Sequence, residues 1–227
     1  MGSTYPDPAT GLWHRLRRAV PRAALLGLVL AGPVAHAAEP APAGTARTET
    51  ALFAGGCFWC VESDFDKVPG VLETISGFAG GALDHPSYRQ VSAGGTGHRE
   101  VVKVVFDPAR VSYRTLVDYF WRTVDPTDAG GQFCDRGDSY TTAIFTQSAQ
   151  QQAEARASLE ALTASHRLPA PVVTEIRAET RFWPAEDYHQ DYYEKNPLRY
   201  KYYRYSCGRD ARLADLWGGD AHRLPGS

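Results

Sequence analysis

A short run of glycine, cysteine and aromatic residues, Gly55-Gly56-Cys57-Phe58-Trp59-Cys60, is the part of the chain best suited to chemistry. Glycines between a strand and a helix let the backbone turn sharply. A cysteine on the first turn of the following helix lies at the positive end of the helix dipole, which favours the nucleophilic thiolate. Phe58 and Trp59 would form an apolar wall suited to a methyl group. The motif predicts a reactive thiol at Cys57.

The cysteine spacing leaves other interpretations open. A bare C-x-x-C is also typical of a generic dithiol redox site, or of a local Cys57–Cys60 disulfide that staples a turn. Zinc sites need a second close pair of ligands, whereas Cys134 and Cys207 are each isolated in the sequence, so we expect no metal. Four cysteines are too few to hold together a disulfide-built scaffold of 227 residues.

Strand and helix patterns alternate around this motif. We expect strands over Thr50–Ala54, Val71–Phe78, Glu100–Phe106, Tyr140–Phe145 and Val172–Ile176, and helices over Cys57–Lys67, Leu116–Trp121, Ser148–His166 and Ala185–Asn196. Ser148 and Gln151 have the spacing of a helix capping box, and Pro197 is expected to close the last helix. Several connections are long and glycine-rich, so we predict a two-layer α/β sandwich with a mixed sheet, ferredoxin-like in class, and not a doubly wound sheet.

One connection is long enough to suggest function by itself. Residues 125–139 (DPTDAGGQFCDRGDS) have no apolar period and are dense in glycine and aspartate. Long loops without secondary structure are uncommon inside compact domains unless they serve a site.

The composition excludes some partners. Apolar residues make up 43% of the chain and charged residues 22%, so a buried core is expected. The net charge is −2, and four arginines lie within the first 37 residues, so the remainder is more acidic and has no basic stripe. We therefore expect no nucleic-acid partner, because affinity for nucleic acid depends on neutralising phosphates.

The first residues are typical of a segment that directs a protein to export. Residues 15–37 contain a basic stretch, an apolar run from Ala23 to Leu30 and then Ala35-His36-Ala37, which is the order of a secretory signal peptide. The apolar run is shorter than the ~20 residues that span a bilayer. An uncleaved membrane anchor is the alternative. We expect a signal peptide over 1–37, a linker over 38–47, a catalytic domain over 48–205 and a C-terminal tail over 206–227.

Six blocks of sequence, taken in order, resemble the A-type peptide methionine sulfoxide reductases. The blocks are GGCFWC, SGFAGG (Ser76–Gly81), PSYRQV (Pro86–Val91), GTGHREVV (Gly95–Val102), DRGDSY (Asp135–Tyr140) and AEDYHQDYYEKNP (Ala185–Pro197). They cover roughly residues 50–200 of the 227-residue chain. Six ordered blocks are far more specific than any one of them.

The resemblance implies a catalytic role for several residues. Cys57 falls on the family's nucleophile, which attacks the sulfur of a methionine sulfoxide and is left as a sulfenic acid. Glu100 falls on the family's acid, Tyr88 and Tyr140 on the two tyrosines that bind the sulfoxide oxygen, and Asp135 on the loop aspartate. A free glutamate with a pKa of ~4.3 is protonated only about 0.2% of the time at neutral pH, so Glu100 must be buried to act as an acid.

His189 and Asp187 also match the family, and we assign them only a supporting role. For both residues we favour exposed helix polarity over a part in the site.

The resemblance leaves the recycling route open. Cys207 resembles the family's mobile resolving cysteine, and we favour a Cys57–Cys207 disulfide over a strained Cys57–Cys60 bridge. Cys60 stands where many members have glycine, and Cys134 where many have asparagine. Cys134 would either form a shuttle disulfide with Cys207 or be an inert thiol. The implied partners are methionine sulfoxide in peptides and proteins and a thioredoxin-like reductant. We expect no cofactor, and a monomer.

Two other functions fit parts of the pattern. A dithiol–disulfide oxidoreductase would use Cys57 and Cys60. A secreted binding domain would instead use the four cysteines as two disulfide staples, with three possible pairings.

The signal-peptide hypothesis has a direct test. Mass spectrometry of the native protein is expected to show cleavage after Ala37, since the small-x-small pattern ends there. An intact N-terminus would contradict it.

Overall fold

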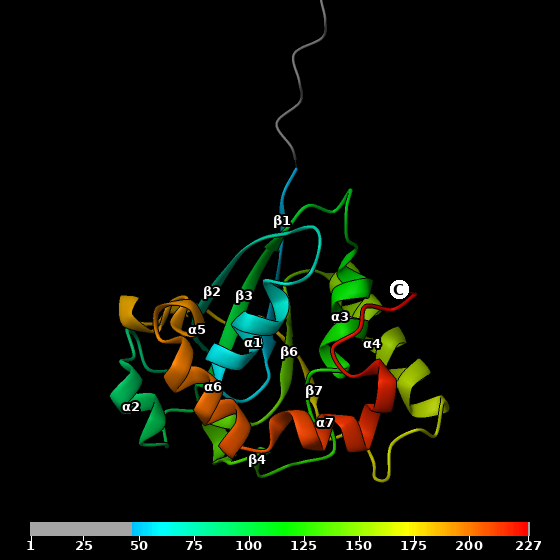
Figure 1. Ribbon diagram of the computed structural model, residues 1–227. Coiled ribbons are helices and arrows are strands. Elements are labelled where there is room, and N and C mark those ends of the chain that lie inside the picture. The colour runs from blue at the N-terminus through cyan, green and yellow to red at the C-terminus, as the bar shows by residue number, and fades with distance from the viewer. Residues whose placement is uncertain (1–46, 227) are drawn as a thin grey trace, which may run out of the picture. The chain divides into compact units, whose positions relative to one another are not determined.

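The structure is a computed structural model that describes residues 47–226 (Figure 1). The predicted signal peptide and all of the predicted linker except Arg47 lie outside the described residues. The strands are β1 (Glu49–Ala54), β2 (Val71–Ala79), β3 (Arg99–Phe106), β4 (Gly131–Gln132), β5 (Asp135–Arg136), β6 (Ala143–Thr146), β7 (Glu175–Ala178) and β8 (Trp183–Pro184). The helices are α1 (Phe58–Phe65), α2 (Tyr88–Ser92), α3 (Tyr113–Trp121), α4 (Ala149–Ala164), α5 (Tyr192–Lys195), α6 (Pro197–Ser206) and α7 (Arg209–Trp217). Short 3-10 turns are η1 (Asp138–Tyr140), η2 (Asp187–His189) and η3 (Gly218–Asp220).

Six of the described strands form one sheet in the order β7-β6-β1-β3-β2-β8. Its centre is built from two β-α-β units, β1-α1-β2 and β3-α3-β6, with the β4–β5 hairpin inserted before β6. The four strands of these units pair antiparallel in the order β6-β1-β3-β2, which is the ferredoxin-like arrangement. β7 joins β6 in parallel and makes the sheet mixed. The predicted two-layer α/β sandwich with a mixed sheet is confirmed.

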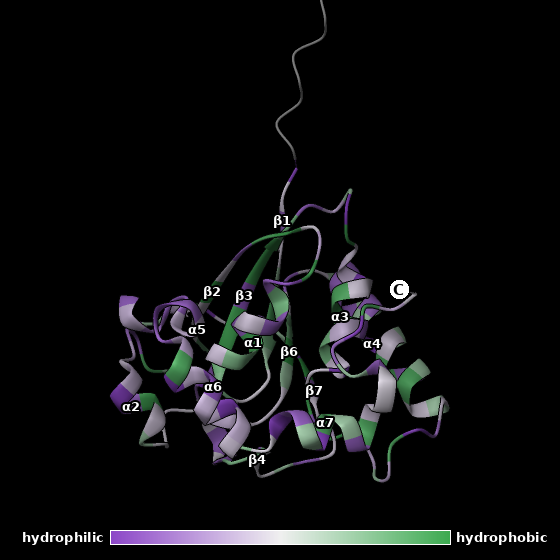
Figure 2. Cartoon of the chain, in the orientation of Figure 1, coloured by the Kyte–Doolittle hydropathy of each residue, from purple (hydrophilic) through white to green (hydrophobic). Residues whose placement is uncertain are grey.

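The main core lies between the sheet and the helices that cover one of its faces. Along β1, Ala51 and Phe53 face this core, whereas Leu52 and Ala54 face a smaller apolar cluster on the other side of the sheet. Successive strand residues point to opposite faces, so a strand that is covered on both sides needs a continuous apolar run. β3 is mostly hydrophobic and is interrupted by a few polar residues (Figure 2).

The helix starts follow the capping signals. Cys57 is the N-cap residue of α1, so the helix begins at Phe58, one position after the expected start. At α4 the Ser148 hydroxyl accepts a hydrogen bond from the backbone N–H of Gln151, which confirms Ser148 as the cap. This bond satisfies one of the amide groups that the first turn of a helix leaves free. The Gln151 side chain accepts the N–H of Gln147 in place of that of Ser148, so the second half of the predicted capping box is not formed.

The predicted helix over 185–196 is wrong. That segment forms the 3-10 turn η2 and the single turn α5, separated by Asp191 at φ +52°. Pro197 does not close a helix. It occupies the first turn of α6, where its missing N–H costs nothing.

The residues after 205, expected as a separate tail, are part of the packed fold. Leu213, Leu216 and Trp217 of α7 are buried in the main core together with residues of α1 and α3. The Trp217 indole N–H donates to the Val124 carbonyl, 3.1 Å away. Figure 1 shows α6 and α7 running one after the other past the end of the sheet at which α1 begins.

Smaller differences concern the edges of the sheet. The long loop predicted over 125–139 contains the β4–β5 hairpin, and Tyr140 belongs to η1, so β6 begins only at Ala143. The strand predicted over Val172–Ile176 lies at 175–178. Among residues 47–226, none of the helices is both long enough and apolar enough to cross a bilayer.

Candidate active site

The turn before Cys57 requires glycine at position 56. Gly56 has φ +80°, and a Cβ there would lie 2.5 Å from the Cβ of Gln132. Gln132 is fully buried on the hairpin, with its side chain hydrogen-bonded to both the N–H and the carbonyl of Asp125. The loop predicted to be functional therefore packs directly against the nucleophile turn.

Cys57 is 6% exposed and is a free thiol in the structure. Burial raises its pKa well above the ordinary value, and the Cys60 sulfur and the Glu100 carboxyl raise it further. A hydrogen bond from Tyr203 acts in the opposite direction. The helix N-terminus was expected to favour the Cys57 thiolate, but in this state desolvation outweighs that effect and favours the thiol.

Cys60 is also a free, buried thiol, and its sulfur is hydrogen-bonded to that of Cys57. That hydrogen bond lowers the pKa of Cys60, and the cations Arg209 and Arg204 lower it further, against the effect of burial. Within the pair, the negative charge is favoured at Cys60. Proton transfer from Cys57 to Cys60 would produce the nucleophile.

Glu100 has the burial that an acid at neutral pH requires. It is 2% exposed, and its Oε2 accepts a hydrogen bond of 2.9 Å from the backbone N–H of Phe58, the residue after Cys57. Burial raises the pKa of Glu100 to about 8, with a further contribution from Asp135 and an opposing one from the Phe58 amide. The carboxyl group is therefore mostly protonated at pH 7 and lies beside the nucleophile.

Tyr88 and Tyr140 meet at this carboxyl group. The Tyr140 hydroxyl is hydrogen-bonded to both Tyr88 and Glu100. Burial and the nearby Glu100 raise the pKa of Tyr88 to about 12 and also raise that of Tyr140. Both hydroxyls stay protonated and can donate hydrogen bonds to an oxygen atom bound beside Glu100.

Aromatic rings form one wall of the site. The Phe58 ring is buried and lies 6.1 Å from the ring of Tyr88 and 6.5 Å from that of Trp59, centroid to centroid. Trp59 is stacked on Tyr192 at 3.7 Å. The apolar wall predicted from Phe58 and Trp59 is thus backed by residues of α5.

Two residues of the η2 turn differ in their surroundings. Asp187 is exposed, which agrees with the interpretation favoured for it. His189 is 1% exposed and accepts a hydrogen bond from the Trp59 indole, so exposed helix polarity is wrong for this residue. Both were expected to lie on one helix, and the turn geometry of η2 is what separates their environments.

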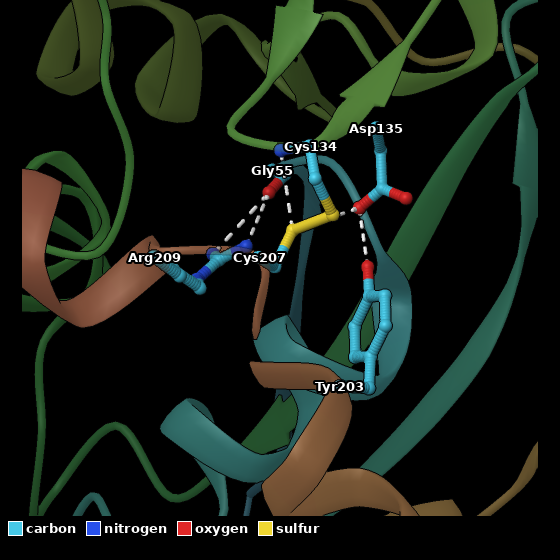
Figure 3. Close-up of a disulfide and its surroundings, with 6 residues drawn as sticks. All are labelled: Gly55, Cys134, Asp135, Tyr203, Cys207 and Arg209. Carbon is cyan, nitrogen blue, oxygen red and sulfur yellow. Dashed lines mark hydrogen bonds between the residues drawn. A yellow bond between two sulfur atoms is a disulfide. The ribbon is translucent and has the colours of Figure 1, made fainter. Parts of the chain in front are cut away.

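Asp135 connects the hairpin to the nucleophile through a residue that the sequence did not single out. The Tyr203 hydroxyl donates to the Asp135 carboxylate (Figure 3). The same hydroxyl is hydrogen-bonded to the Cys57 sulfur. Burial raises the pKa of Asp135, and the Tyr203 hydrogen bond lowers it. The only sequence signal for Tyr203 is its position, four residues before Cys207 in the tyrosine-rich run of α6.

The disulfide in the structure joins Cys134 to Cys207, with the two Cα atoms 4.9 Å apart (Figure 3). It ties the β4–β5 hairpin to the junction of α6 and α7. It is the pairing left open as a shuttle disulfide, whereas the favoured Cys57–Cys207 bond is not formed in this state. Cys134 is exposed, so this disulfide is accessible to an external thiol.

Arg209 of α7 is hydrogen-bonded to the backbone beside the nucleophile turn. This arginine is 2% exposed, and its guanidinium group donates to the carbonyls of Gly55 and Thr123 at 2.8–3.3 Å. It also lies 4.7 Å from the centroid of the Phe133 ring. A single buried cation therefore connects α7, the nucleophile turn and the hairpin.

The chain matches known proteins over almost all of this architecture. A family model described as peptide methionine sulfoxide reductase matches residues 49–220. The peptide methionine sulfoxide reductase MsrA 2 of Rhizobium meliloti (strain 1021) is 56% identical over 181 residues, which span 80% of this chain and 89% of that protein.

Solved structures of similar fold have related names. The methionine sulfoxide reductase A of Corynebacterium diphtheriae is 37% identical, with a TM-score of 0.62 over 68% of this chain and 78% of that one. The reduced form of Mxr1 from Saccharomyces cerevisiae is 30% identical, with a TM-score of 0.63 over 67% of this chain and 87% of that one.

The raised pKa of Glu100 predicts how stability depends on pH. Glu62 of α1 is a matched carboxyl group for comparison. It is fully buried, and burial raises its pKa to about 8 as well. Both groups bind protons on folding between about pH 4.5 and 8, so the stability they contribute is lost as the pH rises through that window. Urea denaturation across the window is expected to show a slope that Glu100→Gln reduces by up to about 1.4 kcal/mol per pH unit.

Glu62→Gln should reduce the same pH slope of the unfolding free energy by the contribution of the Glu62 carboxyl. The double variant should reduce the slope by the sum of the two single reductions. An unchanged slope in Glu100→Gln would show that this carboxyl is ionised in the folded protein.

Proposed function

The chain belongs to the peptide methionine sulfoxide reductase family, and we propose that it reduces methionine S-sulfoxide in proteins, and free methionine sulfoxide, to methionine. The observation that carries this proposal is the meeting of a free thiol and a protonated carboxyl group at the start of α1. Cys57 is the N-cap residue there, and Glu100 accepts the amide N–H of the next residue.

The acid has a defined task. A sulfoxide sulfur is a poor electrophile until its oxygen is protonated or strongly hydrogen-bonded. Glu100 uses its buried proton for this purpose, and the hydroxyls of Tyr88 and Tyr140 donate hydrogen bonds to the same oxygen. Because these three groups already contact one another, little reorganisation is needed when the substrate binds.

The thiol supplies the electrons. The Cys57 thiolate attacks the sulfoxide sulfur, the sulfur–oxygen bond breaks, and the oxygen is transferred to the cysteine. The products are methionine, reduced by two electrons, and a Cys57 sulfenic acid, oxidised by two. Phe58 and Trp59 hold the substrate methyl group against their rings during this step.

Cys60 is the better placed of the two candidate thiols for the next step. Its sulfur is hydrogen-bonded to that of Cys57, whereas Cys207 is already paired with Cys134. Attack of the Cys60 thiol on the sulfenic acid forms a Cys57–Cys60 disulfide and releases water. When Cys134–Cys207 is reduced, Cys207 becomes a second candidate for this attack, as the resemblance implied.

A dithiol protein must then complete the cycle. We assign this role to a thioredoxin-like reductant, which transfers two electrons to the disulfide and is itself oxidised. We also propose that the protein is exported, as residues 15–37 suggest. In an oxidising compartment the reductant would have to receive its electrons from elsewhere.

A single-turnover assay on separated S and R epimers, without added reductant, tests the reaction. Wild type is expected to form about one equivalent of methionine from the S epimer, and Cys57→Ser none, because the nucleophile is lost. Glu100→Gln should slow the step by about 100-fold or more. It should also remove the decline in rate that wild type shows above about pH 8, where Glu100 loses its proton.

Glu62→Gln is the control for the Glu100 variant, since it changes an equally buried carboxyl outside the site. Full activity of Glu100→Gln would contradict the role given to this acid, and turnover by Cys57→Ser would contradict the mechanism.

The order of disulfides is tested separately. After one turnover, peptide mass mapping is expected to find a Cys57–Cys60 bond in wild type and in the Cys134→Ser/Cys207→Ser double variant. Cys60→Ser should still release about one equivalent of methionine, because Cys57 alone takes the oxygen, and should leave a sulfenic acid that a trapping reagent labels.

A Cys57–Cys207 bond in wild type, with Cys134 free, would assign resolution to Cys207 instead. Complete loss of the first turnover in Cys60→Ser would favour the dithiol–disulfide oxidoreductase.

A further inference from the structure

The η2 turn reaches three parts of the site with three side chains. The Glu186 carboxylate accepts the backbone N–H of Tyr88 at 3.0 Å. The Gln190 amide bonds both the N–H and the carbonyl of Ser76, at 2.9 Å each. His189, between them, accepts the indole N–H of Trp59 at 3.0 Å. The segment thus connects α2, β2 and α1.

The contact with Trp59 fixes the proton of His189. An indole N–H can only donate, so Nδ1 of His189 must be the unprotonated nitrogen that accepts it. Burial lowers the pKa of His189 and favours the neutral ring. A neutral imidazole carries one proton, and it must therefore lie on Nε2.

That proton has no acceptor among the described residues, because Nε2 is a buried atom without a hydrogen-bond partner. Leaving a buried donor unsatisfied costs free energy. The opposite tautomer would not be more favourable. It would place the proton of His189 on Nδ1, against the indole N–H of Trp59, so that two hydrogen-bond donors would face each other. The unsatisfied N–H at Nε2 is therefore the cost of keeping Nδ1 of His189 unprotonated, as the acceptor for Trp59.

The Trp59 ring needs such an acceptor to have one orientation. The ring lies flat against Tyr192, at 3.7 Å and 7°, and edge-on to Tyr203. Stacking alone is compatible with a ring turned over about its χ2 bond, since that torsion is broad and roughly two-fold. Only the orientation that directs Nε1 toward His189 satisfies the indole N–H.

The rings around His189 hold the acceptor itself in place. Centroids of Tyr88, Tyr188 and Phe58 lie 4.2, 4.1 and 5.0 Å from the imidazole centroid. Two of these rings belong to the site, so a shift of His189 would displace its walls as well as Trp59.

We propose that His189 is a positioning residue whose Nδ1 acceptor selects the orientation of Trp59 that shapes the site for the methyl group of the substrate. This inference rests on the proposed function. It predicts that His189 affects substrate binding and the preference for a methyl over a larger S-alkyl group, and not the chemical step.

Three variants test whether His189 acts as a hydrogen-bond acceptor or only fills space in the core. His189→Leu removes the acceptor, His189→Asn offers an amide oxygen near the Nδ1 position, and Trp59→Phe removes the donor. With peptide methionine sulfoxide, His189→Leu is expected to raise KM roughly ten-fold, as loss of one buried hydrogen bond implies. Its single-turnover rate at saturation should stay within about two-fold of wild type. Its preference for methionine sulfoxide over ethionine sulfoxide should shrink, and His189→Asn should restore both KM and preference.

Coupling to Trp59 is the decisive comparison. In the Trp59→Phe background, His189→Leu should change neither KM nor preference further, because the donor is already absent. Equal impairment by Leu and Asn, or an undiminished effect in that background, would overturn the proposal. Absence of sulfoxide reduction by wild type would instead contradict the proposed function.

The tautomer can be measured without any substitution. Nitrogen NMR shifts of the wild-type histidines should report Nδ1 of His189 as unprotonated and Nε2 as protonated. A proton on Nδ1 would overturn the proposal even if His189→Leu does not fold.

Discussion

Removing the Glu100 carboxyl group from water sets the chemistry of this site. In contact with solvent the group would be ionised at neutral pH and useless as an acid. Burial reverses this, and the Phe58 amide holds the protonated group beside the thiol. The same burial raises the pKa of Cys57, so the environment that prepares the acid makes the nucleophile harder to ionise. Of its neighbours, Cys60 raises the pKa of Cys57 further, whereas a hydrogen bond from Tyr203 lowers it.

The opposing demands on acid and nucleophile explain why so much of the fold converges on one turn. The hairpin supplies Gln132 and Asp135, and η2 supplies His189. Behind them, Asp64 of α1 is 1% exposed and paired with Arg204 at 3.0 Å and with Arg209 at 3.9 Å. Buried ion pairs add little net stability, but losing one partner leaves the other charge unpaired. The two arginines also act on the Cys60 thiol, so this network has an electrostatic as well as a structural role.

Local patterns in the sequence were enough to predict the central sheet, and the family resemblance was enough to predict the thiol and three groups around it. The pattern around Phe53 is a continuous apolar run, that around Val104 is β-branched and interrupted only by Lys103, and the family blocks contain Cys57, Glu100, Tyr88 and Tyr140. What could not be predicted depends on contacts between distant residues. Pro197 is compatible with a helix end or a helix start, and the non-helical backbone at Asn196, between α5 and α6, makes it the start of α6. Tyr203 belongs to a run of similar tyrosines, and its value lies in its contact with Asp135, 68 residues away.

The hydrogen bonds from Arg209 to the Gly55 carbonyl span 154 residues. Contacts this distant in sequence form late, because a long stretch of chain must be ordered before they close. During synthesis, the segment bearing Cys57 therefore emerges well before the cation that supports it. A nascent chain that ends short of α7 would carry this thiol on an incomplete scaffold. Assembly of the reactive centre thus awaits nearly the whole polypeptide.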